Sequence, residues 1–323
     1  MSTTLTRSRG EERTSLPEVD VVIPTLNCER QLEECLRSLR RQRYEGKVNI
    51  IQIDGGSSDG TVSVGSQFGC EVIIAPGIYP GGLKGSRNLA VSMQRSPLTW
   101  VVDSDNVILG EEALSRLVAP FQSLENLQIS VPLCRTTSNM PPLSRYLTYR
   151  EEMKLERAGR IGYKTGGWIV SEDFSHGVTN CSLIRTDLIR EVGGFDSDIR
   201  VWARARAIGK SKGCIVPEAA YAHFSGECLS SWARKKVGRC RRISRIQGAE
   251  LREYLHPSSR SKSTFLNVVT DILLQPFSWF SLSTVDARAA IFGLAIPVLW
   301  LGMVVRYPVT SLRLVKGFFG DSH

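Results

Sequence analysis

Residues 19–54 read VDVVIPTLNCERQLEECLRSLRRQRYEGKVNIIQID. Two short runs rich in β-branched residues, 19–24 and 48–54, flank a charged stretch between them. The apolar residues of that stretch recur at helical spacing: Leu32, Cys35, Leu36 and Leu39. A strand, a helix and a second strand in this order are typical of a βαβ unit, in which the two strands are parallel. The stretch therefore predicts an α/β fold.

The same alternation continues along the chain. Apolar runs at 71–76, 98–103 and 127–133 predict three more strands, and the Gly-rich stretches 55–69 and 81–96 each predict a loop that leads into a helix. We expect one mostly parallel sheet flanked by helices. In such a sheet the functional side chains lie at the carboxyl ends of the strands, where loops meet helix N-termini.

The sequence around this regular pattern is less periodic. Residues 135–180 predict a substrate-shaping insertion of loops and one charged helix, and residues 181–223 predict the far edge of the same sheet. We expect a single α/β domain over residues 18–229. Residues 1–17 are polar and lack the apolar core of a signal peptide, so they predict a disordered basic tail.

The composition narrows the classes of partner. The chain of 323 residues carries 41 Lys and Arg against 32 Asp and Glu. This balance favours anionic partners, which include nucleic acid, phosphorylated small molecules and an acidic membrane surface. The eight cysteines are scattered singly, without a Cys-x-x-Cys pair. Such spacing fits reduced thiols in a cytosolic compartment better than a disulfide framework or a zinc site.

Residues 230–323 differ in composition from the predicted domain. Basic and apolar residues interleave over 232–245, and an uncharged run, Ala289–Val305, lies between two arginines. That run of about 17 residues is at the lower limit for spanning a bilayer, and Pro297 interrupts it. It fits a span, a re-entrant hairpin, a helix in the membrane interface or a buried core helix. We expect a membrane-associating region at the cytoplasmic face of the cell membrane.

The tripeptide Asp103-Ser104-Asp105 follows the apolar run LTWVV. Ionised carboxylates at the end of a buried strand are costly unless something pairs with them. Mg²⁺ or Mn²⁺ bridging to phosphate oxygens is a natural partner, because these ions prefer one or two carboxylates together with phosphates. The alternative is a strand end followed by a turn at Asp105-Asn106.

Two other stretches carry groups that suit a nucleotide. Asp54 ends the second predicted strand and precedes a Gly-Gly-Ser loop, which could approach a nucleotide closely through its backbone. Lys84 and Arg87 lie among glycines at the start of a predicted helix. The helix dipole and both cations then favour a diphosphate.

In their order and spacing, these stretches resemble the family 2 glycosyltransferases with the GT-A fold. The resemblance covers residues 19 to about 225, roughly two thirds of the chain. It rests on six stretches: VDVVIPTLNCERQLEECLRSL, VNIIQIDGGSSDGT, KGSRNLAV, WVVDSDNVIL, NCSLIRTDLIREVGGFD and AYAHF. It implies a hexosyltransferase that uses a UDP- or GDP-linked sugar together with Mg²⁺ or Mn²⁺.

The resemblance also implies roles for individual residues. Pro24 and Thr25 would line the nucleotide pocket, and Asp54 would contact the base. Arg87 and Asn88 match a nucleotide-contacting pair. Asp103 and Asp105 match the Asp-x-Asp motif that binds ribose and the metal, and His223 matches a histidine near the diphosphate that serves in some members as a metal ligand.

A second Asp-Ser-Asp, residues 196–198, follows Gly193-Gly194-Phe195. By resemblance, Asp198 falls on the acid that serves as general base in inverting members, although Ser197 replaces the usual glutamate. Asp198 is equally suited to cap a helix. A hydroxyl acceptor on a soluble glycan or protein requires a base, whereas a polyprenyl phosphate is already anionic. We expect inverting transfer to a lipid-linked or membrane-proximal acceptor. The hydroxyl acceptor is an alternative, and nucleic-acid binding through 232–245 is a remote one.

Overall fold

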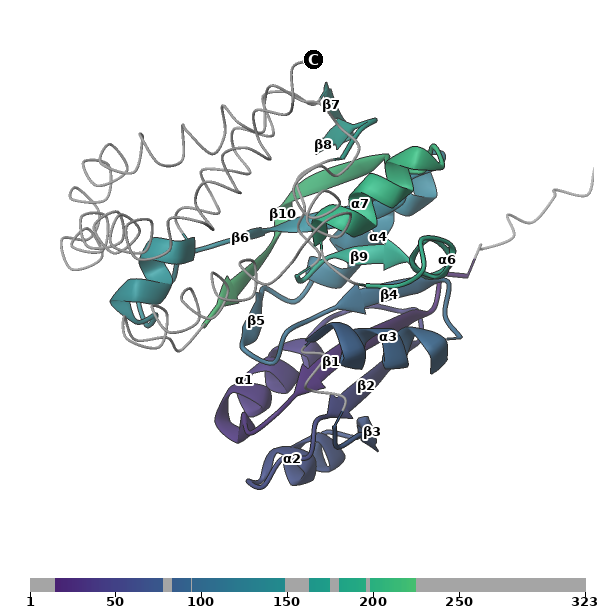
Figure 1. The fold of residues 1–323 in the computed structure, drawn as a ribbon. Helices are drawn as coiled ribbons and strands as arrows, with labels where there is room; N and C mark the ends of the chain where they lie inside the picture. The colour runs from purple at the N-terminus through teal and green to yellow at the C-terminus, as the bar shows by residue number, and fades with distance from the viewer. Residues whose placement is uncertain are drawn as a thin grey trace, which may run out of the picture.

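The computed structural model describes residues 15–77, 83–93, 95–148, 163–174, 180–195 and 198–224. Within them the strands form one ten-stranded sheet, which runs in Figure 1 from β3 at the bottom to β7 at the top. The strands are β1 (Val19–Thr25), β2 (Val48–Asp54), β3 (Glu71–Ile74), β4 (Leu98–Val101), β5 (Asn106–Leu109), β6 (Ile129–Cys134), β7 (Tyr163–Thr165), β8 (Trp168–Ser171), β9 (Leu183–Arg185) and β10 (Gly213–His223). The helices are α1 (Glu29–Arg40), α2 (Thr61–Gln67), α3 (Leu83–Met93), α4 (Ala113–Ser123), α6 (Thr186–Glu191) and α7 (Asp198–Ala207).

The half of the sheet nearest the N-terminus is parallel, as the sequence predicts. β1 pairs with both β2 and β4, and β2 pairs with β3. Val21 and Ile23 of β1 belong to the same buried cluster as the apolar residues of α1, whereas Val22 clusters with Ala90 of α3. Successive side chains of a strand point to opposite faces, so helices cover both faces of this half.

The other half of the sheet is mixed, and it corrects one expectation. β9 lies between β4 and β6 and runs antiparallel to both, and β10 lies between β6 and β8. Residues 181–223 therefore enter the interior of the sheet and not its far edge. Leu183, Ile184 and Cys214 are fully buried, which explains why these strands need a neighbour on each side.

The last two strands of the sheet, β8 and the edge strand β7, come from the segment that the sequence predicts as loops and one helix. They form an antiparallel pair joined at Gly166 and Gly167, both of which have positive φ. β7 is short and polar, with Tyr163 exposed, as is common for an edge strand. Pairing at an edge depends on a distant strand, here β10, and local periodicity carries little sign of it.

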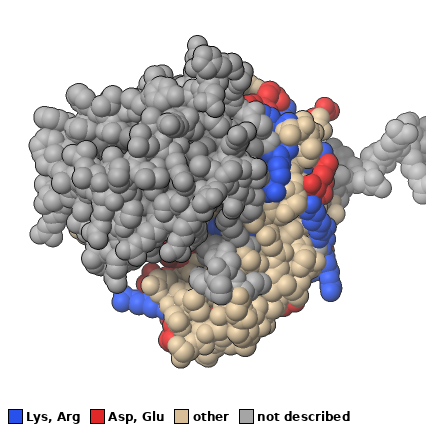
Figure 2. Space-filling view, viewed as in Figure 1, with Lys and Arg blue, Asp and Glu red and all other residues tan. Residues whose placement is uncertain are grey.

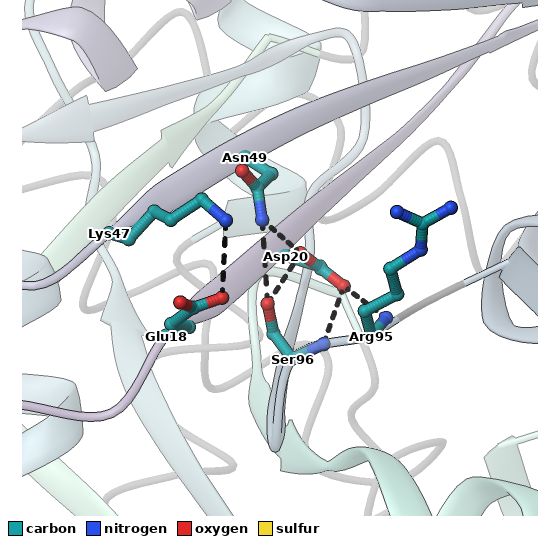
Figure 3. Close-up of polar contacts among 6 residues, drawn as sticks. All are labelled: Glu18, Asp20, Lys47, Asn49, Arg95 and Ser96. Carbon is teal, nitrogen blue, oxygen red and sulfur yellow. Dashed lines mark hydrogen bonds and ion pairs between the residues drawn. The ribbon is translucent and has the colours of Figure 1, made fainter.

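A buried carboxylate anchors the amino end of the parallel half. Asp20 is 2% exposed, and its two oxygens accept hydrogen bonds from Asn49 Nδ2, Ser96 Oγ and the backbone N–H groups of Arg95 and Ser96 (Figure 3). Burial opposes ionisation of Asp20, but these hydrogen bonds outweigh it and lower the pKa of the carboxyl. The network ties the turn before β4 to β1 and β2, at the edge of the sheet opposite the loops described below.

Charges of both signs share the surface of the described residues (Figure 2). Arg206 pairs with Asp173 at 2.6 Å, and Lys212 pairs with Glu172 at 3.1 Å. These exposed pairs contribute little stability, but they leave less positive charge to attract a polyanion.

Several expectations concern residues outside the described part of the chain. They are residues 1–14 of the predicted tail at 1–17, the basic run 232–245 and the uncharged run Ala289–Val305. Within the described ranges, every helix is too short or too polar to cross a bilayer.

Candidate functional site

The loop after β2 folds around the carboxylate of Asp54. Asp54 Oδ1 accepts hydrogen bonds from the backbone N–H groups of Gly56 at 2.9 Å and Ser57 at 2.7 Å. Asp54 Oδ2 accepts hydrogen bonds from Thr25 Oγ1 at 2.9 Å and Ser57 Oγ at 2.6 Å. The parallel pairing of β1 and β2 places Thr25 directly opposite Asp54, so this network follows from the register of the sheet.

Asp54, Pro24 and Thr25 lie in the protein interior at the ends of β1 and β2. All three residues are buried, and Asp54 is 0% exposed. Each oxygen of the carboxylate already has two donors from the protein, which is its ordinary capacity. In this structure Asp54 therefore shapes the loop, and Thr25 supports it through its bonds to Asp54 and to Gly55 N. Contact of these residues with a nucleotide stays a prediction, and for Asp54 it requires an exchange of hydrogen bonds.

The loops after β1 and β2 are also bound directly to each other. Asn27 N donates to Ser57 Oγ at 2.9 Å, and Ser58 N donates back to Asn27 Oδ1 at 2.8 Å. Glu29 N donates to Asp59 Oδ2 at 3.3 Å, and Gly60 N donates back to Glu29 Oε2 at 3.1 Å. These reciprocal bonds satisfy backbone donors at the starts of α1 and α2, and they fix the two loops as one unit.

The first Asp-Ser-Asp forms the turn between β4 and β5. Asn106 N donates to Asp103 O at 3.0 Å, which closes the turn. Asp103 Oδ1 accepts from Arg87 Nη2 of α3 at 2.7 Å, and both side chains are largely buried. The strand thus ends in a turn over Asp103–Asn106, closed by the backbone and accompanied by a buried ion pair, and not in a turn at Asp105-Asn106 alone.

Asp105, on the same turn, faces the end of β10. Asp105 Oδ1 lies 3.3 Å from His223 Nε2, and Phe224 N donates to Asp105 O at 2.8 Å. The antiparallel pairing of β5 with β10 sets Asn106 opposite His223, and this brings the imidazole to the turn. Asp105 and His223 are each about one third exposed, so a ligand can reach them.

Helix α3 connects this turn to a distant segment. The side chain of Asn88 bonds to both backbone polar groups of Phe195, and the guanidinium of Arg87 lies 5.9 Å from the centre of the Phe195 ring. Sequence resemblance implies a nucleotide contact for Asn88, and that contact stays a prediction; in this structure one N–H and the oxygen of its amide bond to Phe195. The side chain of Lys84 lies outside what the structure describes.

The family model of glycosyl transferase family 2 matches residues 20–193, more than half of the chain. The chain belongs to glycosyl transferase family 2.

Curated relatives of this family 2 protein match shorter segments. An uncharacterized glycosyltransferase of Mycobacterium tuberculosis is 32% identical over 111 residues, which are 32% of this chain and 40% of that protein. The poly(ribitol-phosphate) beta-glucosyltransferase of Bacillus spizizenii is 33% identical over 104 residues, which are 31% of this chain and 16% of that protein. The matched segment thus spans well under half the length of each relative.

Among solved structures, the family 2 chain resembles a mannosyltransferase from Pyrobaculum calidifontis, determined in complex with GDP-Man and Mn²⁺. The TM-score is 0.53 at 14% identity, and the match covers 96% of this chain and 89% of that one. The likeness supports the expected GT-A-like α/β fold.

The expected metal-binding set is only partly assembled in the family 2 domain. Within the described residues, no group of three or more His, Cys, Asp or Glu side chains is placed to hold a metal ion. Asp105 and His223 are adjacent and accessible, whereas Asp103 turns to Arg87. The carboxylate oxygen of Asp105 suits Mn²⁺ or Mg²⁺ when diphosphate oxygens complete the coordination, whereas the imidazole nitrogen of His223 suits a transition metal such as Mn²⁺ better than Mg²⁺. The residues present therefore fit Mn²⁺ best.

The second Asp-Ser-Asp is placed only through its last residue. Asp198 is the first residue of α7, so it lies at the start of a helix, as the sequence analysis predicts. Asp196, Ser197 and the side chain of Asp198 lie outside the described part of the structure. The backbone alone thus does not distinguish a general base from a helix cap.

One polar pair beside the Asp-Ser-Asp turn was not predicted. Asn106 Nδ2 donates to Asn180 Oδ1 at 2.6 Å, and Asn106 is fully buried. Cys181, the next residue, has a φ of 56°, which is uncommon outside glycine and marks local strain. Trp100 Nε1 donates to Cys181 O at 3.0 Å and holds this conformation. Asn106 directly follows the tripeptide, and this proximity is the only sequence signal that indicates the pair.

The cysteines around the turn are packing residues. Burial raises the pKa of Cys35 and of Cys181 well above the usual thiol value, so both thiols stay neutral. Cys35 Sγ lies 3.7 Å from Asp103 O, within reach of a weak hydrogen bond. The six cysteines that the structure describes are free thiols: Cys28, Cys35, Cys70, Cys134, Cys181 and Cys214.

Proposed function

We propose that this protein is a metal-dependent inverting glycosyltransferase that moves a sugar from a nucleotide diphosphate sugar to a lipid-linked or other membrane-proximal acceptor. The observation that carries the proposal is the turn after β4 in a family 2 domain. There Asp103 pairs with Arg87 and Asp105 pairs with His223, which brings two carboxylates, a guanidinium and an imidazole to one edge of the sheet. Such a group suits a diphosphate that carries a divalent cation.

The proposed donor site uses the chain's own charges in distinct ways. Arg87 and the first turn of α3, which includes Lys84, would face the diphosphate with a helix dipole and cationic side chains. Asp105 and His223 would hold Mg²⁺ or Mn²⁺, and Asp103 would orient the donor. When bound, the ion would stabilise the negative charge of the departing nucleoside diphosphate. The similar mannosyltransferase binds GDP-Man and Mn²⁺, but its likeness concerns the fold, so the argument for a metal rests on Asp105 and His223.

The acceptor is inferred from chemistry outside the described residues. The basic run 232–245 and the uncharged run Ala289–Val305 suit an anionic membrane surface, and we propose that they hold the enzyme at its cytoplasmic face. The name of the Bacillus spizizenii relative describes a polyol phosphate polymer as its acceptor, which agrees with a phosphate-bearing acceptor here. If the acceptor is a soluble glycan or protein hydroxyl, Asp198 at the start of α7 is the candidate base.

A screen of nucleotide sugars tests the donor class. The full chain is incubated with UDP- and GDP-linked sugars, with Mn²⁺, with Mg²⁺ or with a chelator, and release of nucleoside diphosphate and thermal stabilisation are measured. We expect at least one donor to be hydrolysed and to stabilise the fold only in the presence of metal. Binding and hydrolysis that are equal with and without the chelator would contradict the metal assignment.

Membrane attachment is tested separately. The full chain and a chain that ends near Leu229 are mixed with vesicles that contain anionic lipid and then sedimented. We expect only the full chain to sediment with the vesicles. Equal recovery of both chains in the supernatant would exclude membrane binding by the C-terminal region.

A further inference from the structure

Asn88 of α3 makes a two-point contact with the backbone of Phe195, 107 residues further along the chain. Phe195 N donates to Asn88 Oδ1 at 2.6 Å, and Asn88 Nδ2 donates to Phe195 O at 2.8 Å. The side-chain amide therefore pairs with this residue as a neighbouring strand would. Both distances are short for their type, so the contact is well formed.

The segment around Phe195 is shaped to receive this contact. Gly194 has a φ of +84°, and a Cβ at this position would lie 2.6 Å from Asn88 Oδ1. Arg204 Nη2 of α7 donates to Gly194 O at 3.2 Å. The Phe195 ring is buried in the cluster that also contains Val201 and Trp202 of α7. The segment is thus held between α3 and α7.

The residue beside Asn88 faces the proposed donor site. Arg87 bonds to Asp103, and the same guanidinium lies over the Phe195 ring. Two consecutive residues of one helix therefore reach the Asp103 turn and the Phe195 segment. Because Phe195 packs in one buried cluster with Val201 and Trp202 of α7, and Arg204 of α7 bonds to Gly194, α3 links the donor site to α7.

We propose that Asn88 is a positioning residue, which fixes Phe195, and through it the start of α7 with Asp198, relative to the donor site at Asp103. Its amide serves this purpose instead of nucleotide binding. The catalytic part of this proposal rests on the proposed transferase function. It predicts that loss of the amide lowers transfer to a hydroxyl acceptor, the reaction in which Asp198 would act as the base, without lowering affinity for the nucleotide.

The first test replaces the amide in the full chain. In Asn88→Ala, hydrogen exchange is expected to increase at the Phe195 amide and across residues 194–198. We expect the dissociation constant of the nucleoside diphosphate with Mn²⁺ to stay within about twofold and transfer to a hydroxyl acceptor, for which Asp198 is the candidate base, to fall about 10²-fold. A nucleotide contact would instead raise that dissociation constant in proportion to the lost activity.

The second variant, Asn88→Asp, distinguishes the loss of this contact from a loss of folding. Asn88→Asp keeps the size of the side chain and an acceptor for Phe195 N, but it sets a carboxylate oxygen against Phe195 O. We expect the same pattern as in Asn88→Ala, because only the full amide satisfies both backbone groups. The matched control is Asn49→Ala at the opposite edge of the sheet, where Asp20 keeps its other three donors. This control should leave exchange at 194–198 and turnover unchanged.

The outcomes separate the inference from the proposed function. Unchanged exchange at Phe195, or a nucleotide affinity that falls with turnover, would overturn the positioning role. A wild-type chain that binds no nucleotide and releases none from any nucleotide sugar would overturn both the transferase function and the catalytic role of Asn88. Hydrogen exchange would still decide whether Asn88 holds Phe195.

Discussion

Arg87 Nη2 lies 2.7 Å from Asp103 Oδ1, and the two side chains are only 10% and 17% exposed. The neighbouring pair of Asp105 and His223 is longer and more accessible. The two carboxylates of this tripeptide therefore lie in different electrostatic environments. The first stabilises a buried guanidinium, and the second is available to a ligand.

Replacement of each aspartate by asparagine should separate these environments. Asp103→Asn removes the charge that faces a buried cation, and we expect the free energy of unfolding to fall by about 2 kcal/mol. Asp105→Asn, near the surface, should change it by less than about 1 kcal/mol. Both variants should lose at least about 10²-fold in donor turnover, because both alter the proposed donor site. Urea unfolding and release of nucleoside diphosphate measure the two effects, and full activity in both variants would exclude this turn as the donor site.

The two glycines before Phe195 provide a matched pair of variants. Both have positive φ, so alanine at either position should cost about 1 kcal/mol or more in stability. A Cβ on Gly193 would meet Arg204 Nη1 at an ordinary 3.7 Å, whereas one on Gly194 would overlap Asn88 Oδ1. We expect Gly194→Ala to lose more stability and to lose turnover, and Gly193→Ala to retain turnover. Thermal unfolding and donor turnover, measured together, check this. Equal effects of the two variants would argue against the Asn88 contact.

The Asp20 network should make stability depend on pH. Four donors surround the carboxylate (Figure 3), and an amide in its place would turn an NH₂ group toward N–H or O–H donors. We expect Asp20→Asn to lower the free energy of unfolding by about 2 kcal/mol at neutral pH.

The pKa of Asp20 is lowered in the folded state, so its contribution is fully present above the unfolded-state pKa of about 3.9. It is lost as the pH falls through the folded-state value. The gap between wild type and Asp20→Asn should therefore be constant above about pH 5 and shrink below about pH 4. Urea unfolding across this range measures it, and a gap that widens on acidification would contradict the sign.

The parallel half of the fold could be predicted because its signals are local. The strands β1, β2, β3 and β4 fall where the apolar runs place them, α1 falls where the helical spacing places it, and α2 and α3 follow the Gly-rich stretches as predicted. The position of Asp103 and Asp105 at the end of β4 follows from the same pattern. His223 beside Asp105 was inferred from family resemblance, and the pairing of β5 with β10 provides the physical cause.

The remaining features depend on contacts between residues far apart in the sequence. β9 inserts between β4 and β6, and Asn88 meets Phe195 across 107 residues, so no local period indicates either feature. The inward orientation of Asp54 likewise depends on Thr25 in the neighbouring strand. Sequence motifs identified which residues have the chemical groups to bind a metal ion or a nucleotide. The hydrogen-bond network determines which of them are available to a ligand.

Asp198 offers a test of the acceptor. It begins α7, and asparagine caps a helix about as well as aspartate does but does not accept a proton as a base. If the acceptor is a hydroxyl, Asp198→Asn and Asp198→Ala should both lose about 10²–10⁴-fold in transfer. If the acceptor is a lipid phosphate, Asp198→Asn should retain activity, and Asp198→Ala should lose mainly stability, by about 1 kcal/mol.

The matched control for these variants is Asp187→Asn, in the first turn of the neighbouring helix α6. Asp187 is exposed and accepts a hydrogen bond from Leu188 N within its own helix, so its replacement should leave transfer unchanged. Transfer to a polyprenyl phosphate and to a soluble glycan is measured side by side for all three variants and the wild type. Loss of both activities in Asp198→Asn would reject the phosphate acceptor as the reason for the altered motif, because an anionic nucleophile requires no base.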